Sequence, residues 1–236
     1  MNEEKPNEVK EVAKELIDLE GNKVFRTLHH LTTRPGQMIA EYCQGGKNKY
    51  LSPVTYFVGV TAVEGFIASS LGLIEFVAKK NTEDLSKTFS DPAFSKLGID
   101  ASTISDKLNV AGSFLMSETG QKVTIIPIVL LFTWLFYKKY NRSFKESSWF
   151  ALYTLGHVTL LTLPVMLYWY FTKDLAVYSA IGLIFSSLYW IWASMQFYSL
   201  SIGRAIFLRV AFLVTILLVF SIATTTIMLL YLLSSS

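Results

Sequence analysis

Five apolar segments of this chain are long enough, or nearly long enough, to cross a lipid bilayer as helices. The first covers residues 52–77 and carries an acidic residue, Glu64, near its middle. A helix of about 20 apolar residues spans the roughly 30 Å hydrocarbon core, where an unpaired backbone group finds no water. With 52% hydrophobic and 17% charged residues, the chain is also too apolar for an ordinary soluble domain. The sequence therefore predicts an all-α polytopic membrane protein with five transmembrane helices.

The other four predicted spans follow a hydrophilic stretch at residues 78–121, which we expect to form short helices outside the membrane. These spans cover residues 123–137, 149–171, 175–198 and 208–233. The first of the four is short, and lysines at both of its ends allow it to cross because their side chains extend to the interface. Three residues alone join the next two spans, which predicts an antiparallel hairpin.

Positive charges concentrate before the first span, between the second and third, and between the fourth and fifth. Arg204 and Arg209 mark the last of these basic loops. All three regions lie on one side if every span crosses, and basic loops favour the cytoplasm. The N-terminus is therefore predicted to be cytoplasmic and the C-terminus outside. The chain divides into a cytoplasmic segment, residues 1–51, and a five-helix membrane domain, residues 52–236, with a helical external loop at 78–121.

The cytoplasmic segment has helical periodicity in three places, residues 7–20, 23–33 and 37–44. The sequence Arg34-Pro35-Gly36 separates the second helix from the third, because a proline disfavours a helical conformation at the residue before it. Ser52 and Pro53 favour a helix start at the membrane, with serine as the cap and proline at the first helical position.

A spaced motif before the first span resembles a known family. Its residues here are Thr27-Leu28, Leu31, Arg34-Pro35-Gly36, Ile39, Tyr42, Gly46-Lys47, Tyr50 and Pro53. The motif is similar to that of bacterial, Bacteroidetes-type polytopic membrane proteins of unknown function, and this resemblance implies the bacterial inner (plasma) membrane. Many of those proteins carry an N-terminal zinc ribbon whose paired cysteines are not in this sequence, so no function of that ribbon transfers. The five-span topology also resembles Yip-type trafficking proteins, by topology alone.

Glu64 is the main candidate for a functional residue, because an ionisable group near mid-membrane is costly unless it faces protein, water or a partner. It could relay a proton or bind a cation, or it could be a hydrogen-bonded structural residue. Gly65, Ser69 and Gly72 share a small-residue face that allows close helix packing, either within the chain or between copies.

Two further polar residues lie within predicted spans. His157 in the third and Gln196 in the fourth can both hydrogen-bond between helices, which is the more common role for such residues. The sequence indicates that Glu64 lies deeper than His157, so a pair between them requires matching depths.

A basic membrane-proximal patch contains Arg26, Arg34, Lys47 and Lys49. Such a patch binds anionic lipid head groups, although ordinary positive-inside charge bias gives the same pattern. Cys43, the one cysteine, cannot form an internal disulfide, and an inert thiol is its expected state.

The sequence contains no paired-carboxylate site, phosphate loop, nucleophile elbow or metal-ligand spacing, so no enzyme activity, cofactor or metal is expected. Nucleic-acid binding is not expected either, because the net charge is only +3. We expect a non-enzymatic membrane subunit or scaffold that engages itself, lipid or a partner protein. The alternatives are an oligomeric ion channel or small transporter using Glu64, and an envelope-stress or infection sensor.

Overall fold

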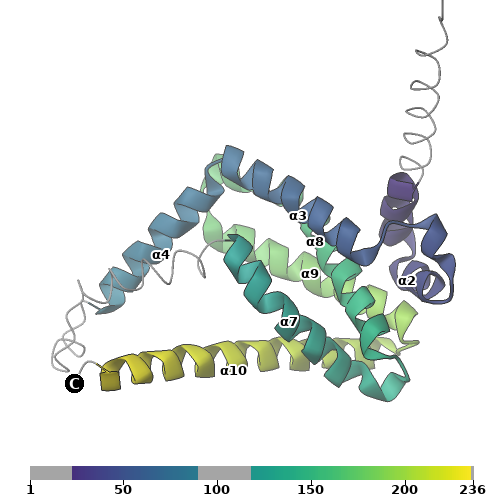
Figure 1. Ribbon diagram of the computed structural model, residues 1–236. Coiled ribbons are helices and arrows are strands. Elements are labelled where there is room, and N and C mark those ends of the chain that lie inside the picture. The colour runs from purple at the N-terminus through teal and green to yellow at the C-terminus, as the bar shows by residue number, and fades with distance from the viewer. Residues whose placement is uncertain (1–22, 90–117, 235–236) are drawn as a thin grey trace, which may run out of the picture.

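The computed structural model describes residues 23–89 and 118–234, and every element in these ranges is helical (Figure 1). The elements are a helix over residues 23–33, α2 (Pro35–Cys43), the short 3-10 helix η1 (Gly46–Lys49), α3 (Pro53–Ser70), α4 (Leu73–Phe89), α7 (Glu118–Tyr137), the 3-10 helix η2 (Lys138–Tyr140), α8 (Phe144–Thr172), α9 (Leu175–Phe197) and α10 (Ile202–Ser234). The predicted helix at 7–20 and most of the predicted external loop lie outside the described residues.

Four helical segments in the described part of the chain are long and apolar enough to cross a membrane. They are Gly46–Ser70, Phe144–Thr172, Leu175–Phe197 and Ile202–Val219. These correspond to the first, third, fourth and fifth predicted spans. Helix α7 forms where the second was predicted, but it is not among these four. The protein is therefore a helical multi-pass membrane protein by its four candidate spans.

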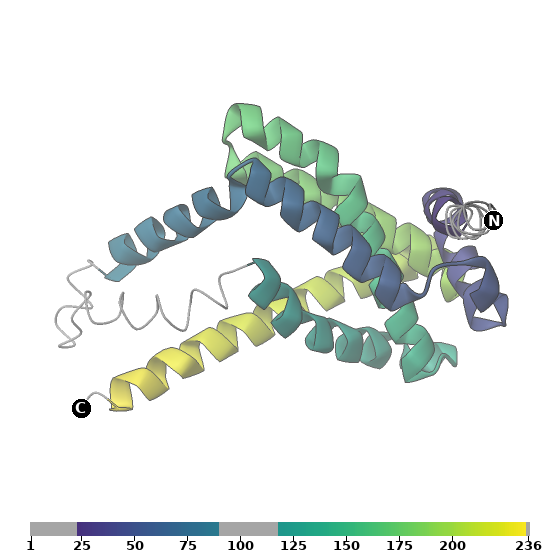
Figure 2. The same ribbon diagram turned by 45° about the horizontal axis from the view of Figure 1, so that its top comes forward.

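Helix α8 lies at the centre of the bundle, with α3, α7 and α9 packed against it. Helix α10 packs on α9 and α7, while α2 packs against α8 and α9 at one end of the bundle. In Figure 2, α4 and the C-terminal part of α10 extend away from that end. The bundle is thus most tightly assembled where the N-terminal segment meets it.

Aromatic rings from four helices form the core at this tightly assembled end. Tyr137 of α7 stacks on Tyr198 with ring centroids 4.3 Å apart. Trp190 of α9 lies 5.3 Å from Phe150 of α8 and 5.5 Å from Phe212 of α10. Each such pair adds about 0.5–1.5 kcal/mol beyond the burial of its area, so these contacts fix the helix ends relative to one another.

The predicted first span at 52–77 is interrupted. Helix α3 ends at Ser70, and Gly72 adopts a left-handed conformation with φ of 72°, which glycine accepts without steric cost. Helix α4 then leaves in a new direction (Figure 1). Its first turns pack on the tip of the α8–α9 hairpin, where Phe76 contacts Trp169 with centroids 5.2 Å apart. Helix α4 continues to Phe89, so it extends into the stretch predicted to form short external helices.

Capping residues explain where the central helices begin. Ser52 accepts a hydrogen bond from the Thr55 amide at 3.1 Å, which confirms the predicted start of the first span. Ser143 and Glu146 form a reciprocal capping box, so α8 begins at residue 144 rather than at the predicted 149. Asp174 caps α9 through the Val177 amide at 3.0 Å. The predicted hairpin between these helices is confirmed.

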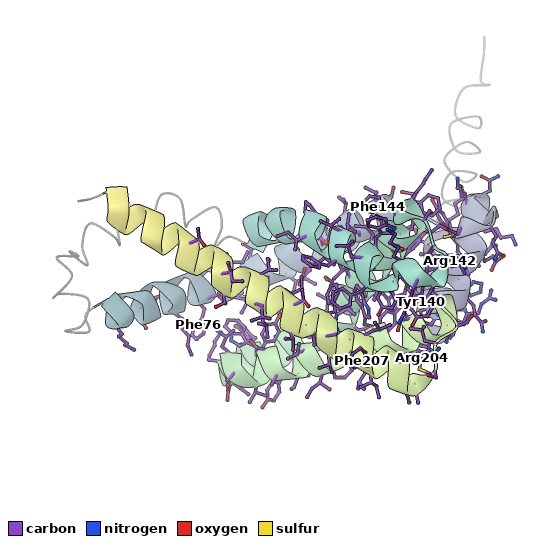
Figure 3. All side chains as sticks on the ribbon, turned by 90° about the horizontal axis from the view of Figure 1, so that it is seen from below. Phe76, Tyr140, Arg142, Phe144, Arg204 and Phe207 are labelled. Carbon is purple, nitrogen blue, oxygen red and sulfur yellow. The ribbon has the colours of Figure 1, made fainter. Side chains whose placement is uncertain are left out.

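Helix α10 begins six residues before the predicted 208, and this changes the environment of Arg209. The prediction that Arg209 belongs to a basic loop was wrong: the side chain lies inside α10 and is 5% exposed. Its guanidinium donates to Ser186 Oγ at 2.7 Å and lies 5.0 Å from the centre of the Trp190 ring. Arg204, in contrast, is exposed at the end of the bundle (Figure 3).

Lysines lying over aromatic rings are found at both ends of α8. Lys145 lies 5.1 Å from the centre of Trp149 near the start of α8, and Lys173 lies 4.3 Å from that of Trp169 near its end. The two tryptophans are 20 residues apart, which corresponds to about 30 Å of helix and matches the hydrocarbon thickness of a bilayer. Amphipathic rings and snorkelling lysines are typical of membrane interfaces.

Candidate functional site

The segment over residues 23–50, here called the N-terminal platform, consists of the first described helix, α2 and η1. It lies against the ends of α8 and α9 (Figure 1). Basic residues from separate parts of the chain gather at this same end, where Figure 3 shows Arg142 and Arg204.

Gly36 permits the closest approach between the platform and the membrane helices. A Cβ atom at this position would lie 2.4 Å from both the Ala193 carbonyl oxygen and the Phe197 backbone nitrogen. The Gly36 amide donates to Gln196 Oε1 at 3.0 Å, and the Gln37 amide lies 3.4 Å from the same oxygen. Gln196, a predicted interhelical residue, therefore accepts hydrogen bonds from backbone amides in the first turn of α2, which have no partner inside that helix.

His157 links the platform to two membrane helices, and its side chain is fully buried. Its Nδ1 lies 2.7 Å from the Tyr56 hydroxyl of α3, and its Nε2 lies 3.2 Å from Thr32 Oγ1. Thr32 already donates its proton to the Leu28 carbonyl at 2.8 Å. Consequently Nε2 carries the imidazole proton and donates it to Thr32, while Nδ1 accepts from Tyr56. This assignment makes His157 a neutral, fully hydrogen-bonded residue.

Tyrosine hydroxyls from the spans bind backbone carbonyls of the platform and of the chain that follows it. Tyr189 donates to the Leu31 carbonyl at 2.9 Å, and Tyr153 donates to the Leu51 carbonyl. Thr27, also buried, accepts from the Leu51 amide at 3.0 Å. Sequence reasoning did not single out these tyrosines. Tyr56, the partner of His157, could have been found from its helical spacing with Val60 and Glu64, which places the three residues on one face of α3.

A charged network closes the outer side of the platform around Glu41. This carboxylate accepts from Lys49 Nζ at 2.8 Å and from the Tyr50 hydroxyl at 2.8 Å, and lies 3.5 Å from Arg34. The two hydrogen bonds, followed by the nearby charges, lower its pKa. His30 Nδ1 accepts from Arg34 at 3.1 Å, and burial together with the Arg34 charge lowers the pKa of this imidazole.

Acid is expected to loosen this network. The folded state lowers the pKa of His30 from 6.5 and that of Glu41 from 4.5, so folded protein binds fewer protons than unfolded protein. Stability from His30 therefore decreases as the pH falls below about 6.5, and stability from Glu41 below about 4.5. Thermal melting in detergent between pH 7 and pH 4 should show this decrease. Glu41→Gln should reduce the fall in melting temperature below pH 4.5, whereas Glu75→Gln in α4 should leave that fall unchanged. Equal pH profiles of melting temperature for the two variants would contradict the prediction.

The structure places Glu64 on the inward face of α3, where it is 8% exposed. Tyr56, Val60 and Ala68 lie on the same buried face. Glu64 lies about two helical turns beyond Tyr56, and the hydrogen-bond partners of His157 are Tyr56 and Thr32. The structure thus does not bring Glu64 and His157 together as a pair.

Within residues 23–89 and 118–234, the predicted small-residue face makes no close helix contact at Gly65 or Ser69. Ser69 is exposed, and a Cβ at Gly65 would meet no atom within 4 Å. Gly72 acts instead through its backbone at the α3–α4 break. Both predicted uses of this face, packing within the chain and contact between copies, stay predictions.

The predicted basic patch divides into two parts. Arg34 and Lys49 both lie within 4 Å of Glu41, so that carboxylate compensates part of their charge, while Arg26 is partly buried. Lys47 points elsewhere and lies 5.3 Å from the centre of the Trp149 ring.

Burial raises the pKa of the Cys43 thiol to about 12, which keeps it protonated and weakly nucleophilic.

The chemistry available among the described residues is mainly hydrogen bonding and charge pairing. No group of three or more histidine, cysteine, aspartate or glutamate residues within 23–89 and 118–234 has the arrangement needed to hold a metal ion. The side chains of Arg209, His157 and Gln196 each contact a neighbouring helix or the platform. Together, the fold and these contacts define a helical membrane protein with a platform fixed to one end.

Comparison with known proteins gives one match. The profile of a family described as "Protein of unknown function (DUF3667)" matches residues 22–64, which comprise the platform and most of α3. No curated protein and no solved structure matches the chain. The match therefore covers the segment whose residues make the interlocking contacts described above, and it adds no activity.

Proposed function

We propose that this protein is a non-enzymatic membrane subunit or scaffold that presents the N-terminal platform to a partner at the membrane surface. The observation that supports this role most directly is how polar side chains of the platform and of α8 and α9 are used. His157 and Gln196 hydrogen-bond the platform to the membrane helices, and Glu41 hydrogen-bonds within the platform itself. Groups that could have served catalysis thus contribute to a fixed surface.

The proposal includes five spans in a bacterial inner membrane, with the platform in the cytoplasm and the C-terminus outside. Helix α7 supplies the additional span in this arrangement, since its 20 residues extend about 30 Å along α8. Lysines at 138 and 139 follow it at the end where Arg142 and Arg204 lie (Figure 3). Positive charge at that end supports a cytoplasmic orientation.

Phe25 is the residue through which we expect the platform to contact a partner protein. It is 71% exposed and stacks on His29 with ring centroids 6.2 Å apart. Thr27 and Leu31, on the opposite face of the same helix, are buried. A large aromatic side chain held in place on an anchored helix suits protein recognition, because little of its conformational freedom is lost on binding.

The test is extraction of the native complex in a lipid-preserving particle, followed by measurement of its mass and identification of co-purifying proteins. We expect added mass from a second copy or from a foreign protein. Phe25→Ser should remove it, whereas Phe171→Ser, an 82% exposed phenylalanine at the other end of α8, should not. A particle containing one chain and no other protein would contradict the proposal.

The channel alternative lacks a specific supporting observation. Glu64 lies on the buried face of α3, with Val60 and Ala68, rather than on a face that could line an axis between copies. For the sensor alternative, most of residues 78–121 lie outside the described residues. We therefore retain the scaffold as the proposed function.

A further inference from the structure

Two lysines from distant parts of the sequence converge on one tryptophan. Lys47 of η1 and Lys145 of α8 lie 5.3 and 5.1 Å, respectively, from the centre of the Trp149 ring. Both distances are within the roughly 6 Å range of cation–π attraction. Both lysines are exposed, so their ammonium groups remain accessible from outside the protein.

The backbone before Lys47 is shaped to bring it to this ring. Gly45 has a φ of 119°, which favours glycine, and a Cβ at Gly46 would lie 2.8 Å from the Glu41 carbonyl oxygen. On the other side, Tyr42 packs edge-on against Trp149 with ring centroids 5.1 Å apart. The platform therefore positions both the lysine and the face of the indole.

The nearby carboxylates are engaged by other groups. Glu146 pairs with Arg142 at 3.3 Å and also accepts from the Ser143 amide and hydroxyl. Glu41 pairs with Lys49 and Arg34. The two ammonium groups beside Trp149 therefore remain available to attract an anion at this ring.

The position of Trp149 along α8 indicates which kind of anion suits this site. This residue lies about 30 Å along α8 from Trp169, a separation that matches the hydrocarbon thickness of a bilayer and favours Trp149 at one interface. Lipid phosphates lie at that level. We propose that Lys47, Lys145 and Trp149 form a binding site for the phosphate of an anionic phospholipid, an inference that deepens the proposed function by naming its lipid ligand.

The experiment is native mass spectrometry of the purified chain in neutral detergent, titrated separately with phosphatidylglycerol, phosphatidylcholine and inorganic phosphate. Lys47→Gln/Lys145→Gln should weaken phosphatidylglycerol binding by about 25-fold, or roughly fivefold per ammonium group. Lys138→Gln/Lys139→Gln is the matched control. It removes the same charge at the same end of the bundle, from lysines that lie over two separate rings, Trp134 and Tyr140. The control should lose less than about threefold, since only general attraction is reduced.

Preference for phosphatidylglycerol over phosphatidylcholine, lost in the first variant alone, is the expected result. Equal losses in both double variants would overturn the site, because net charge would then account for binding. Saturation of the site by inorganic phosphate, with equal affinity, would overturn the assignment to lipid. This readout is separate from partner co-purification, so failure of the lipid site is distinguishable from failure of the scaffold role.

Discussion

Replacing Gly36 with alanine is expected to undock α2 from α9 and lower the melting temperature of the purified protein by roughly 5 °C or more. The added methyl group would lie 2.4 Å from two backbone atoms, the Ala193 carbonyl oxygen and the Phe197 nitrogen. Backbone atoms inside a helix cannot rotate away as a flexible side chain can. The platform must therefore shift, and the 3.0 Å hydrogen bond from the Gly36 amide to Gln196 would be lost with it.

Gly182→Ala is the matched control for this prediction. Gly182 lies within α9, and an added Cβ there would meet no atom within 4 Å. Alanine stabilises a helix interior by roughly 0.5–1 kcal/mol relative to glycine, so this control should be neutral or slightly stabilising. Fluorescence-detected melting in detergent measures both variants. An unchanged melting temperature for Gly36→Ala would show that α2 is not held against α9 as described.

Local signals in the sequence predicted much of the fold. Ser52 and Pro53 defined the start of α3, and the short connection through Asp174 predicted the α8–α9 hairpin. Such signals depend on residues within one or two turns of each other, so they can be read without knowing what packs nearby. The capping box at Ser143 was present in the sequence as well, although the prediction began the helix five residues later.

Features that depend on distant contacts were not predictable in the same way. The α3–α4 break at Gly72 is stabilised by packing of Phe76 on Trp169, nearly a hundred residues later. Arg209 was assigned to a loop because a charge normally ends an apolar span, whereas Trp190 and Ser186 provide partners for it inside the bundle. Both errors arise where a tertiary contact overrides a local preference.

The candidate site shows the same division. Sequence reasoning identified His157 and Gln196 as interhelical hydrogen-bonding residues, but their partners lie far away in the chain: Tyr56 is 101 residues and Thr32 is 125 residues from His157. Residue type alone indicated that a buried histidine needs partners. Which hydroxyls supply them depends on how the platform docks, and that information is in the three-dimensional arrangement.

Replacing His157 with leucine is expected to destabilise the protein by about 2 kcal/mol or more, because it leaves the buried Tyr56 hydroxyl without its acceptor. Tyr56 is 3% exposed and its hydroxyl lies 2.7 Å from His157 Nδ1. The substitution also removes the 3.2 Å contact to Thr32, so hydrogen exchange of the backbone over residues 23–33 should become faster. His29→Leu, a histidine exposed on the same end of the protein, should change neither quantity appreciably.

A double variant separates loss of the hydrogen bond from loss of packing. Tyr56→Phe removes the hydroxyl that His157→Leu would leave unsatisfied, so the double variant should be more stable than His157→Leu alone. The coupling between the two sites should be about 1 kcal/mol, within the range for residues that share a hydrogen bond. Strict additivity of the two losses in stability would mean that the pair contributes through packing alone. With coupling present and exchange over residues 23–33 faster, His157 is one of the residues through which the membrane helices hold the platform.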